Sequence, residues 1–355
     1  EFNTGPPPGG LRENVGLPLT EVTIADVLKS AGYVTGAVGK WHLGMAPHFH
    51  PFKRGYDEFF GFLHGGHSYI DPGVGTWNPI LRGTDQVDEK EYLTDAFSRE
   101  AVAFVERHKD GAFFLYLAYN AVHTPMHGPE RYKNSFKHIS NNKRRIYAGM
   151  LTAMDEGIGA LLAKLRELDI EQDTLLFFVN DNGGPTPANG SSNTPLRATK
   201  GTMYEGGIRV PFMVQWPRRL KAGQVYEHPV IALDILPTAA AAAAADLPRD
   251  RKIDGVNLLP HLTGRKEQQP HEILYWRRGQ DHAVRKGNFK LVKTGGESGL
   301  YDLVSDIGET KDLSKERPET VRQLQQAYDK WNAQMIEPVW TRQQRKRTTT
   351  RKKKA

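Results

Sequence analysis

The chain has 355 residues, of which 38% are hydrophobic and 10% aromatic. This length allows one large α/β domain, or a large domain with a smaller one, around a sizeable core. No stretch approaches the roughly 18 apolar residues of a membrane-spanning helix, so the sequence predicts no membrane span. The chain contains no cysteine, which excludes disulfides and thiol nucleophiles within it and leaves the compartment open.

The net charge of +7 is unevenly distributed. Eight cations lie in residues 342–354, and removing them from the total leaves −1 for the rest of the chain. Blocks of like charge are usually solvated, so residues 341–355 are predicted to form a basic, disordered tail. The alternative for this tail is binding to a polyanion such as a nucleic acid or a sulfated polysaccharide. No feature indicates a specific nucleic-acid partner.

Helices and strands alternate along the first 216 residues. A helix is predicted over 23–31, with Thr23 as its N-cap and Gly32 as its stop, and a strand follows over 34–38. The later elements are a helix over 93–108, a strand over 112–119, a helix over 143–168, and strands over 174–179 and 212–216. Continuous apolar strands that alternate with helices indicate an α/β fold with a mainly parallel sheet covered on both faces.

The pattern of predicted elements changes after Pro270. The alanine run 239–245 still predicts a packed helix of the larger domain, because alanine is the best helix former. Short strands are then predicted over 272–276, 282–285, 289–293 and 300–303, followed by a helix over 318–334. We therefore predict a catalytic domain over 1–268, an antiparallel subdomain with one helix over 269–340, and the tail over 341–355.

Polar residues follow three of the predicted strands directly. They are Lys40 and His42 after the first strand, Asn120 and His123 after the second, and Asn180, Asp181 and Asn182 after the third. In open α/β sheets, ligands bind at the carboxyl ends of the strands. Three such clusters on three strands therefore predict one shared site, whereas a single loop aspartate is usually a turn residue.

The residue types indicate the chemistry of this site. An ammonium and an imidazole two positions apart, at Lys40 and His42, suit anion binding and proton transfer. Asp181 and Asn182 offer hard oxygens that suit Ca²⁺ or Mg²⁺ better than zinc, with a solvated turn as the alternative. Lys200 precedes a glycine-rich turn and can reach an anionic oxygen, with a plain surface lysine as the alternative.

These motifs carry a family resemblance. GYVTGAVGKWHLG (32–44) resembles the second signature of the sulfatases, within the alkaline-phosphatase-like superfamily. HTP (123–125), DNGG (181–184) and KGTMYEGGIRVP (200–211) resemble later motifs in the family's order, and RKGNFKLV (285–292) and LYDLVSDIGETKDL (300–313) resemble its small C-terminal domain. The match runs from about 15 to 340. It implies an alkaline-phosphatase-like, mainly parallel sheet plus a small antiparallel sheet with one helix.

The resemblance also implies a reaction, the hydrolysis of a sulfate ester. In sulfatases a cysteine or serine is oxidised to formylglycine, whose hydrate attacks sulfur and releases the alcohol. By position, Lys40 and Lys200 would bind sulfate oxygens and offset charge in the transition state. His123 with Lys200 would assist departure of the leaving group, and His42 would help to regenerate the aldehyde.

A metal, a substrate class and a compartment are implied in the same way. Asp181 and Asn182 would be two ligands of Ca²⁺, with Mg²⁺ possible as well. The substrate would be a sulfated small molecule or glycan, such as the sulfate ester of a carbohydrate or an aryl alcohol. The family is mostly periplasmic, secreted or lysosomal, but the sequence itself does not fix the compartment or the oligomeric state.

Two parts of the family pattern are absent from this sequence. The nucleophile motif C/S-x-P-x-R does not occur, and the paired aspartates of the family's first strand are not found. Residues 3–10 resemble the loop that follows the nucleophile helix. We therefore expect an N-terminally truncated sulfatase without the nucleophile, its arginine partner, two metal ligands and a central strand, and we expect no turnover by this chain alone.

Two other functions remain open at this stage. One is a phosphate or phosphonate ester hydrolase of the same superfamily, and the other is a non-catalytic protein that binds a sulfated glycan. Lys40, His42 and Lys200 favour sulfate. The loops 48–79 and 185–193 would line the substrate pocket, where Trp77, Tyr69 and His67 are candidates to stack on a sugar ring, with ordinary loop packing as the alternative.

Overall fold

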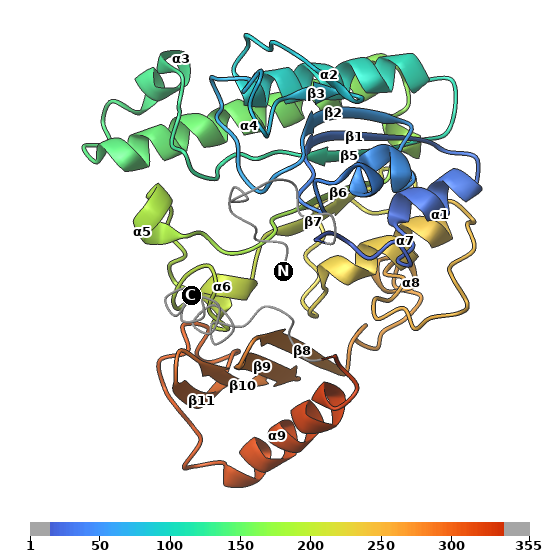
Figure 1. Cartoon of the computed structure of the whole chain (residues 1–355). Coiled ribbons are helices and arrows are strands. Elements are labelled where there is room, and N and C mark those ends of the chain that lie inside the picture. The colour runs from blue at the N-terminus through green and yellow to red at the C-terminus, as the bar shows by residue number, and fades with distance from the viewer. Residues whose placement is uncertain (1–14, 337–355) are drawn as a thin grey trace, which may run out of the picture.

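The computed structural model describes residues 15–336. The predictions for residues 1–14, for 337–340 and for the basic tail 341–355 lie outside this range. Figure 1 shows a large part that carries β1 to β7 and a smaller part that carries β8 to β11 with α9. The predicted boundary between residues 268 and 269 falls in the connection between α8 (Leu259–Leu262) and β8 (Ile273–Arg278).

The central sheet of the large part has five strands in the order β4-β3-β2-β1-β5. Its core is parallel, because β1 pairs in parallel with β2 on one side and with β5 on the other. β6 and β7 form a separate antiparallel pair. The strands are β1 (Val34–Lys40), β2 (Glu58–Phe62), β3 (Leu81–Arg82), β4 (Asp85–Gln86), β5 (Phe113–Ala118), β6 (Leu176–Val179) and β7 (Phe212–Gln215).

The predicted class, a mixed and mainly parallel sheet, is confirmed. The difference lies in the third and fourth predicted strands, which pair with each other and not with the parallel strands. β2 was not predicted at all. Between β1 and EFFGF the chain has only two three-residue 3-10 helices, Pro47–Phe49 and Pro51–Lys53, and no α-helix, so the alternation of helices and strands does not reveal this strand.

Helices cover both faces of this sheet (Figure 1). α2 packs on β1, β2 and β5 and against α4, whereas α1 packs on β1 and against α7. The helices are α1 (Ile24–Ser30), α2 (Leu93–His108), α3 (Glu130–Lys133), α4 (Asn142–Glu167), α5 (Thr186–Asn189), α6 (Glu205–Ile208), α7 (Ile235–Ala242), α8 and α9 (Pro318–Asn332). α2 has the bounds that the sequence predicts.

Local chemistry explains where two of these helices begin and end. Thr23 caps α1 as predicted, because its Oγ1 accepts from Asp26 N at 3.1 Å and its N–H donates to the Asp26 carboxylate at 2.8 Å. α7 begins at Ile235, before the alanine run, and ends at Ala242. Ala244 lies in the left-handed region with φ 52°, so the last alanines of the run do not continue the helix.

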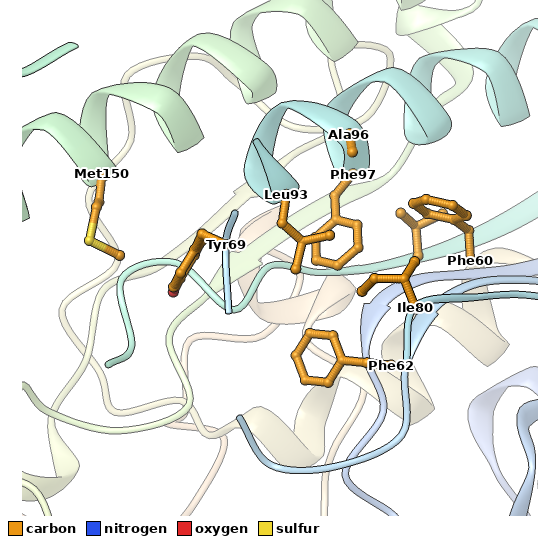
Figure 2. Packing of buried hydrophobic residues seen from close by; sticks show 9 residues of the cluster. Phe60, Phe62, Tyr69, Ile80, Leu93, Ala96, Phe97 and Met150 are labelled. Carbon is orange, nitrogen blue, oxygen red and sulfur yellow. The ribbon is translucent and has the colours of Figure 1, made fainter. Parts of the chain in front are cut away.

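Alternate residues of the central strands face two hydrophobic clusters. Val38 and Phe60 pack with Phe97 of α2 in the cluster of Figure 2. Their neighbours Ala37 and Phe59 belong to a second cluster on the α1 side. This separation is the two-residue period of a strand, and burial on both faces explains why β1 reads as a continuous apolar run.

Two glycines of β1 let the backbone pack closely. A Cβ at Gly36 would lie 2.4 Å from the ring of Phe104, which belongs to α2. A Cβ at Gly39 would lie 2.1 Å from the carbonyl oxygen of Ala118 in β5, and Gly39 has φ 112°. Only glycine fits this second position, because both the space and the backbone conformation exclude a side chain.

The smaller part is an antiparallel sheet in the order β11-β10-β9-β8, covered by α9 (Figure 1). Its strands are β8, β9 (Asp281–Lys286), β10 (Phe289–Thr294) and β11 (Glu297–Asp302). Aromatic stacking fixes α9 on the sheet, with ring centroids 4.9 Å apart for Tyr275 and Trp331 and 3.8 Å apart for His282 and Tyr328. All four predicted strands and the final helix are found. Among residues 15–336, no helix is long and apolar enough to cross a membrane.

The close contact at Gly39 predicts a large loss of stability on substitution. We expect Gly39→Ala to lower the free energy of unfolding by about 3 kcal/mol, because a strained φ and a steric clash combine. Gly32→Ala is the matched control. Gly32 also has a left-handed φ, 87°, but a Cβ there would meet nothing within 4 Å. Gly32→Ala should lower the free energy of unfolding by about 1 kcal/mol. Equal urea midpoints for the two variants would contradict this explanation.

Candidate active site

Four loops bring the predicted site residues to the carboxyl ends of the strands. Lys40 is the last residue of β1, and His42 lies two residues beyond it. His123 follows β5, Asp181 follows β6, and Lys200 lies in the segment before α6. Lys40, Lys200, Asp181 and His123 each shift the pKa of at least one other group of this set, and His42 is shifted by three of them, so the structure places the five residues near one another.

The segment after β1 is anchored by the tryptophan between the two polar residues. Trp41 is buried in the cluster of Ala37, and its Nε1 donates to the carbonyl of Phe49 at 2.9 Å. The Trp41 and His42 N–H groups extend the pairing with the end of β2 at 3.0 Å each. His42 itself has φ 57°. This turn lets Lys40 and His42 lie at the site while Trp41 packs in the core.

Lys40, His42 and His123 are partly buried, whereas Lys200 is exposed, and the two lysines lower the pKa of the groups near them. Burial lowers the pKa of Lys40, the negative charge of Asp181 opposes that shift, and the positive charge of Lys200 adds to it. Burial also lowers the pKa of His42 to about 4, with further contributions from Lys40, His64, Lys200 and His123. His42 is therefore neutral at neutral pH, in an environment that disfavours further positive charge.

His123 has one ring nitrogen fixed by the backbone. Its Nδ1 lies 2.7 Å from the carbonyl oxygen of Thr124, which can only accept, so Nδ1 carries the proton and Nε2 is the basic nitrogen of the neutral ring. Burial lowers the pKa of His123, and the charges of Lys40 and Lys200 lower it further. The hydrogen bond to Thr124 thus orients the ring with Nε2 as its proton acceptor, in surroundings that disfavour the protonated form.

Asp181 and Asn182 provide two hard oxygen donors at consecutive positions. Their chemistry suits Ca²⁺, which binds about six to eight oxygens. Within residues 15–336, no group of three or more histidine, cysteine or acidic side chains could hold a metal ion. The two residues therefore have the right donor type for the predicted calcium site but are too few to form it by themselves.

The segment that carries Lys200 is held by the smaller sheet. The Arg197 guanidinium lies 3.9 Å from the ring centroid of Tyr204 and donates to the carbonyl of Glu309 at 2.8 Å. Arg278, at the end of β8, donates to the carbonyl of Gly201. These contacts on both sides of Lys200 show that the position of this lysine depends on the C-terminal sheet.

Comparisons with known proteins agree with this geometry. Residues 3–245 match the family model Sulfatase, and residues 198–334 match the model of the C-terminal region of N-sulphoglucosamine sulphohydrolase. The chain belongs to the sulfatase family. Its mixed sheet and smaller antiparallel sheet are the fold expected from the motifs.

Two curated sulfatases illustrate the similarity. The chain is 35% identical over 292 residues to N-acetylgalactosamine-6-sulfatase of Homo sapiens, covering 78% of this chain and 54% of that protein. It is 29% identical over 381 residues to the uncharacterized sulfatase YdeN of Escherichia coli K12, covering 87% of this chain and 66% of that protein. The chain thus spans about half to two thirds of the length of these relatives.

A solved structure is matched by this chain over a larger share of its own length than the two curated sulfatases are. The crystal structure of Ps i-CgsB in complex with k-i-k-neocarrahexaose superposes with a TM-score of 0.87 at 37% identity, covering 93% of this chain and 78% of that chain. This agreement extends through both parts of the sulfatase fold.

A buried ion cluster joins the two parts of this sulfatase close to Lys200. Lys290 of β10 places its Nζ 2.6 Å from Glu205 Oε1 and 2.9 Å from Glu309 Oε1. The Lys290 and Glu309 side chains have no exposed surface, and Glu205 is 3% exposed. Burial raises the pKa of the Glu309 carboxyl. Glu205 begins α6, five residues after Lys200, so the cluster fixes the far end of the lysine's segment.

Tyr69 supports the His123 loop, a role that the sequence does not indicate. Its hydroxyl donates to the carbonyls of Asn120 at 2.6 Å and His123 at 2.9 Å. The ring is 1% exposed and packs in the cluster of Figure 2. Of the two possibilities that the sequence left open for Tyr69, stacking on a sugar does not fit the structure, because its ring is buried in the core. No sequence signal links Tyr69 to His123, since 54 residues separate them.

Removing the cation of the buried ion cluster should be costly. We expect Lys290→Met to lower the free energy of unfolding by about 3 to 5 kcal/mol, because two buried carboxyl groups lose their counterion. Lys293→Met is the matched control on the same strand, where the lysine is exposed, and should change stability by less than about 0.5 kcal/mol. Both free energies of unfolding are measured by urea unfolding. Similar decreases for Lys290→Met and Lys293→Met would show that the buried cluster does not stabilise the fold.

The low pKa of His42 predicts a pH dependence of stability. The unfolded chain binds this proton near pH 6.5 and the folded chain near 4, so the unfolded state binds more protons between these values. The free energy of unfolding should therefore fall as the pH drops from about 6.5 towards 4.

The same titration can be followed in the NMR signals of the His42 ring. Lys200→Ala should raise the pKa of His42, because it removes a nearby positive charge. Lys221→Ala, at an exposed lysine that does not act on His42, should leave the pKa unchanged. If Lys200→Ala left the pKa of His42 unchanged, the two groups would not share a site.

Proposed function

We propose that this site binds the sulfate ester of a carbohydrate and, together with a nucleophile that this sequence does not contain, serves its hydrolysis. The observation that carries the proposal is the convergence of two lysines and two neutral imidazoles at one end of the sheet. Positive charge is accumulated there beyond what the nearby Asp181 offsets. An anionic group such as sulfate would relieve that repulsion.

Lys40 and Lys200 are the anion-binding groups in this proposal. Burial is the main cause of the lowered pKa of Lys40, and the positive charge of Lys200 lowers it further. A sulfate ester between them would be attracted by both. As negative charge grows on the sulfate oxygens in the transition state, that attraction increases, which is the condition for catalysis rather than mere binding.

His123 is the candidate acid for the departing alcohol. The bond from Nδ1 to Thr124 orients the ring and leaves Nε2 to exchange a proton. A bound sulfate ester would raise the pKa of His123, because its negative charge offsets the lysines that now lower it. The substrate itself would thus help to protonate the group that donates to the leaving oxygen.

The nucleophile of the family lies outside these assignments. Formylglycine, formed from cysteine or serine, supplies the oxygen that attacks the ester sulfur in sulfatases. The 355-residue sequence has no cysteine and no C/S-x-P-x-R motif. We therefore propose that this chain by itself binds sulfate esters without turning them over.

A calcium site is part of the same proposal. Asp181 and Asn182 would supply two of the oxygen ligands, and residues outside 15–336 would have to supply the others. Two ligands support only weak binding. Asp181→Asn should abolish whatever calcium binding calorimetry detects for this chain, whereas Asp173→Asn, at an exposed carboxylate elsewhere, should not. Equal binding by both variants would place the calcium elsewhere.

The names of two relatives support a carbohydrate as the substrate class. One is named N-acetylgalactosamine-6-sulfatase, and another was solved in complex with k-i-k-neocarrahexaose. Both names refer to carbohydrates. We take a sulfated carbohydrate, rather than an aryl sulfate, as the substrate of the proposed site.

Sulfate binding without turnover is the test of this proposal. Inorganic sulfate should raise the pKa of both His42 and His123, and Lys200→Ala should weaken sulfate binding about tenfold, equivalent to about 1.4 kcal/mol. The 355-residue chain should release no alcohol from p-nitrophenyl sulfate. Turnover that Lys200→Ala abolishes would contradict the inactivity, and stronger binding of phosphate than of sulfate would favour a phosphate ester hydrolase.

A further inference from the structure

The loop between β2 and β3 contains three aromatic residues of the predicted substrate pocket, and the structure separates them. His67 is 6% exposed and lies 4.9 Å from the ring of Phe62, centroid to centroid. Tyr69 is buried in the same cluster (Figure 2). Neither ring can stack on a ligand in this conformation. Trp77 differs from both, because it is 45% exposed.

Trp77 is connected to the active site through a second ring. The centroids of Trp77 and His64 lie 4.7 Å apart with an angle of 81° between the rings, an edge-to-face contact. His64 in turn lies 6.0 Å from His42, centroid to centroid. The three rings therefore lead from the exposed surface to the imidazole beside Lys40.

The loop around Trp77 is held in place by the next residue. The buried Asn78 side chain accepts from His64 N at 3.2 Å and donates to the carbonyl of Gly66 at 3.1 Å. The preceding turn is closed by Thr76, whose N–H and hydroxyl donate to the carbonyl of Gly73 at 3.0 and 2.6 Å. An exposed indole on a loop fixed in this way loses little conformational freedom when a ligand binds.

The other side of this loop packs directly on the active site. A Cβ at Gly65 would lie 2.4 Å from His42 Nε2, so only glycine lets the loop approach the imidazole this closely. The backbone of the Trp77 loop thus forms the wall of the site on the His42 side. This wall therefore borders the imidazole on which Lys40 acts.

We propose that Trp77, supported by His64, is the platform on which the sugar ring of a sulfated carbohydrate lies. The indole offers a flat apolar surface for the C–H groups of the ring, and the lysines take the sulfate. This inference rests on the proposed function, because it requires the sulfate to bind at Lys40 and Lys200. It adds a determinant that recognises the carbohydrate rather than the sulfate.

The test compares three ligands on the 355-residue chain by calorimetry. The probes are N-acetylgalactosamine 6-sulfate, the oligosaccharide k-i-k-neocarrahexaose and inorganic sulfate. At least one sulfated sugar should bind more tightly than inorganic sulfate. Trp77→Ala should weaken binding of that sugar about fivefold to tenfold and leave the affinity for inorganic sulfate unchanged. Trp77→Phe should restore part of the loss.

Ile70→Ala is the matched control, because Ile70 lies in the same loop and is 69% exposed. It should change none of the affinities. The platform is wrong if neither sugar binds more tightly than inorganic sulfate, or if Trp77→Ala leaves the sugar affinity unchanged.

A different set of results would show that the proposed function itself is wrong. Inorganic sulfate would then not bind, or Lys200→Ala would not weaken it, whatever happens at Trp77. A loss of both sugar and sulfate affinity in Trp77→Ala would show a collapse of the loop on His42 and would also overturn the platform.

Discussion

The buried cluster of Lys290, Glu205 and Glu309 is the interaction on which the arrangement of the active site depends. A lysine with no exposed surface is tolerated only where carboxylates compensate its charge, and here they come from α6 and from the loop after β11. The ions therefore hold three distant segments in one geometry. Lys200 lies on the segment between β6 and α6, so the small sheet contributes to a site built on the large one.

In the active site, by contrast, the positive charges outnumber the carboxylates that act on them. The cluster around Lys290 compensates a buried cation fully, whereas Lys40, Lys200, His42 and His123 face one another with Asp181 as the acidic group that acts on them. Burial then lowers the pKa of Lys40 and of both histidines, because positive charge is disfavoured there. This difference in charge balance is what the proposal of an anion-binding site rests on, whereas the cluster of Lys290 links segments of the fold.

Much of this organisation could be predicted from the sequence, where local rules apply. The bounds of α2, the cap of α1 at Thr23 and the four strands of the small sheet follow from periodicity and capping. Lys40 and His123 follow neighbouring parallel strands of one sheet, as the sequence indicates, whereas Asp181 follows β6, which belongs to the separate pair with β7. The pairing of β6 with β7 and the existence of β2 could not be predicted, because both depend on partners distant in the sequence.

The sequence by itself determined the family and the class of fold, because the order and spacing of the motifs and the alternation of helices and apolar strands specify both. Only the tertiary structure decided which aromatic residues face the core and which face the site. Tyr69 and Trp77 belong to one loop and look equivalent in the sequence, yet one is 1% exposed and the other 45%. The reason is that burial of a loop side chain is set by packing against distant elements, here α2 and the His123 loop, and not by its neighbours in the chain.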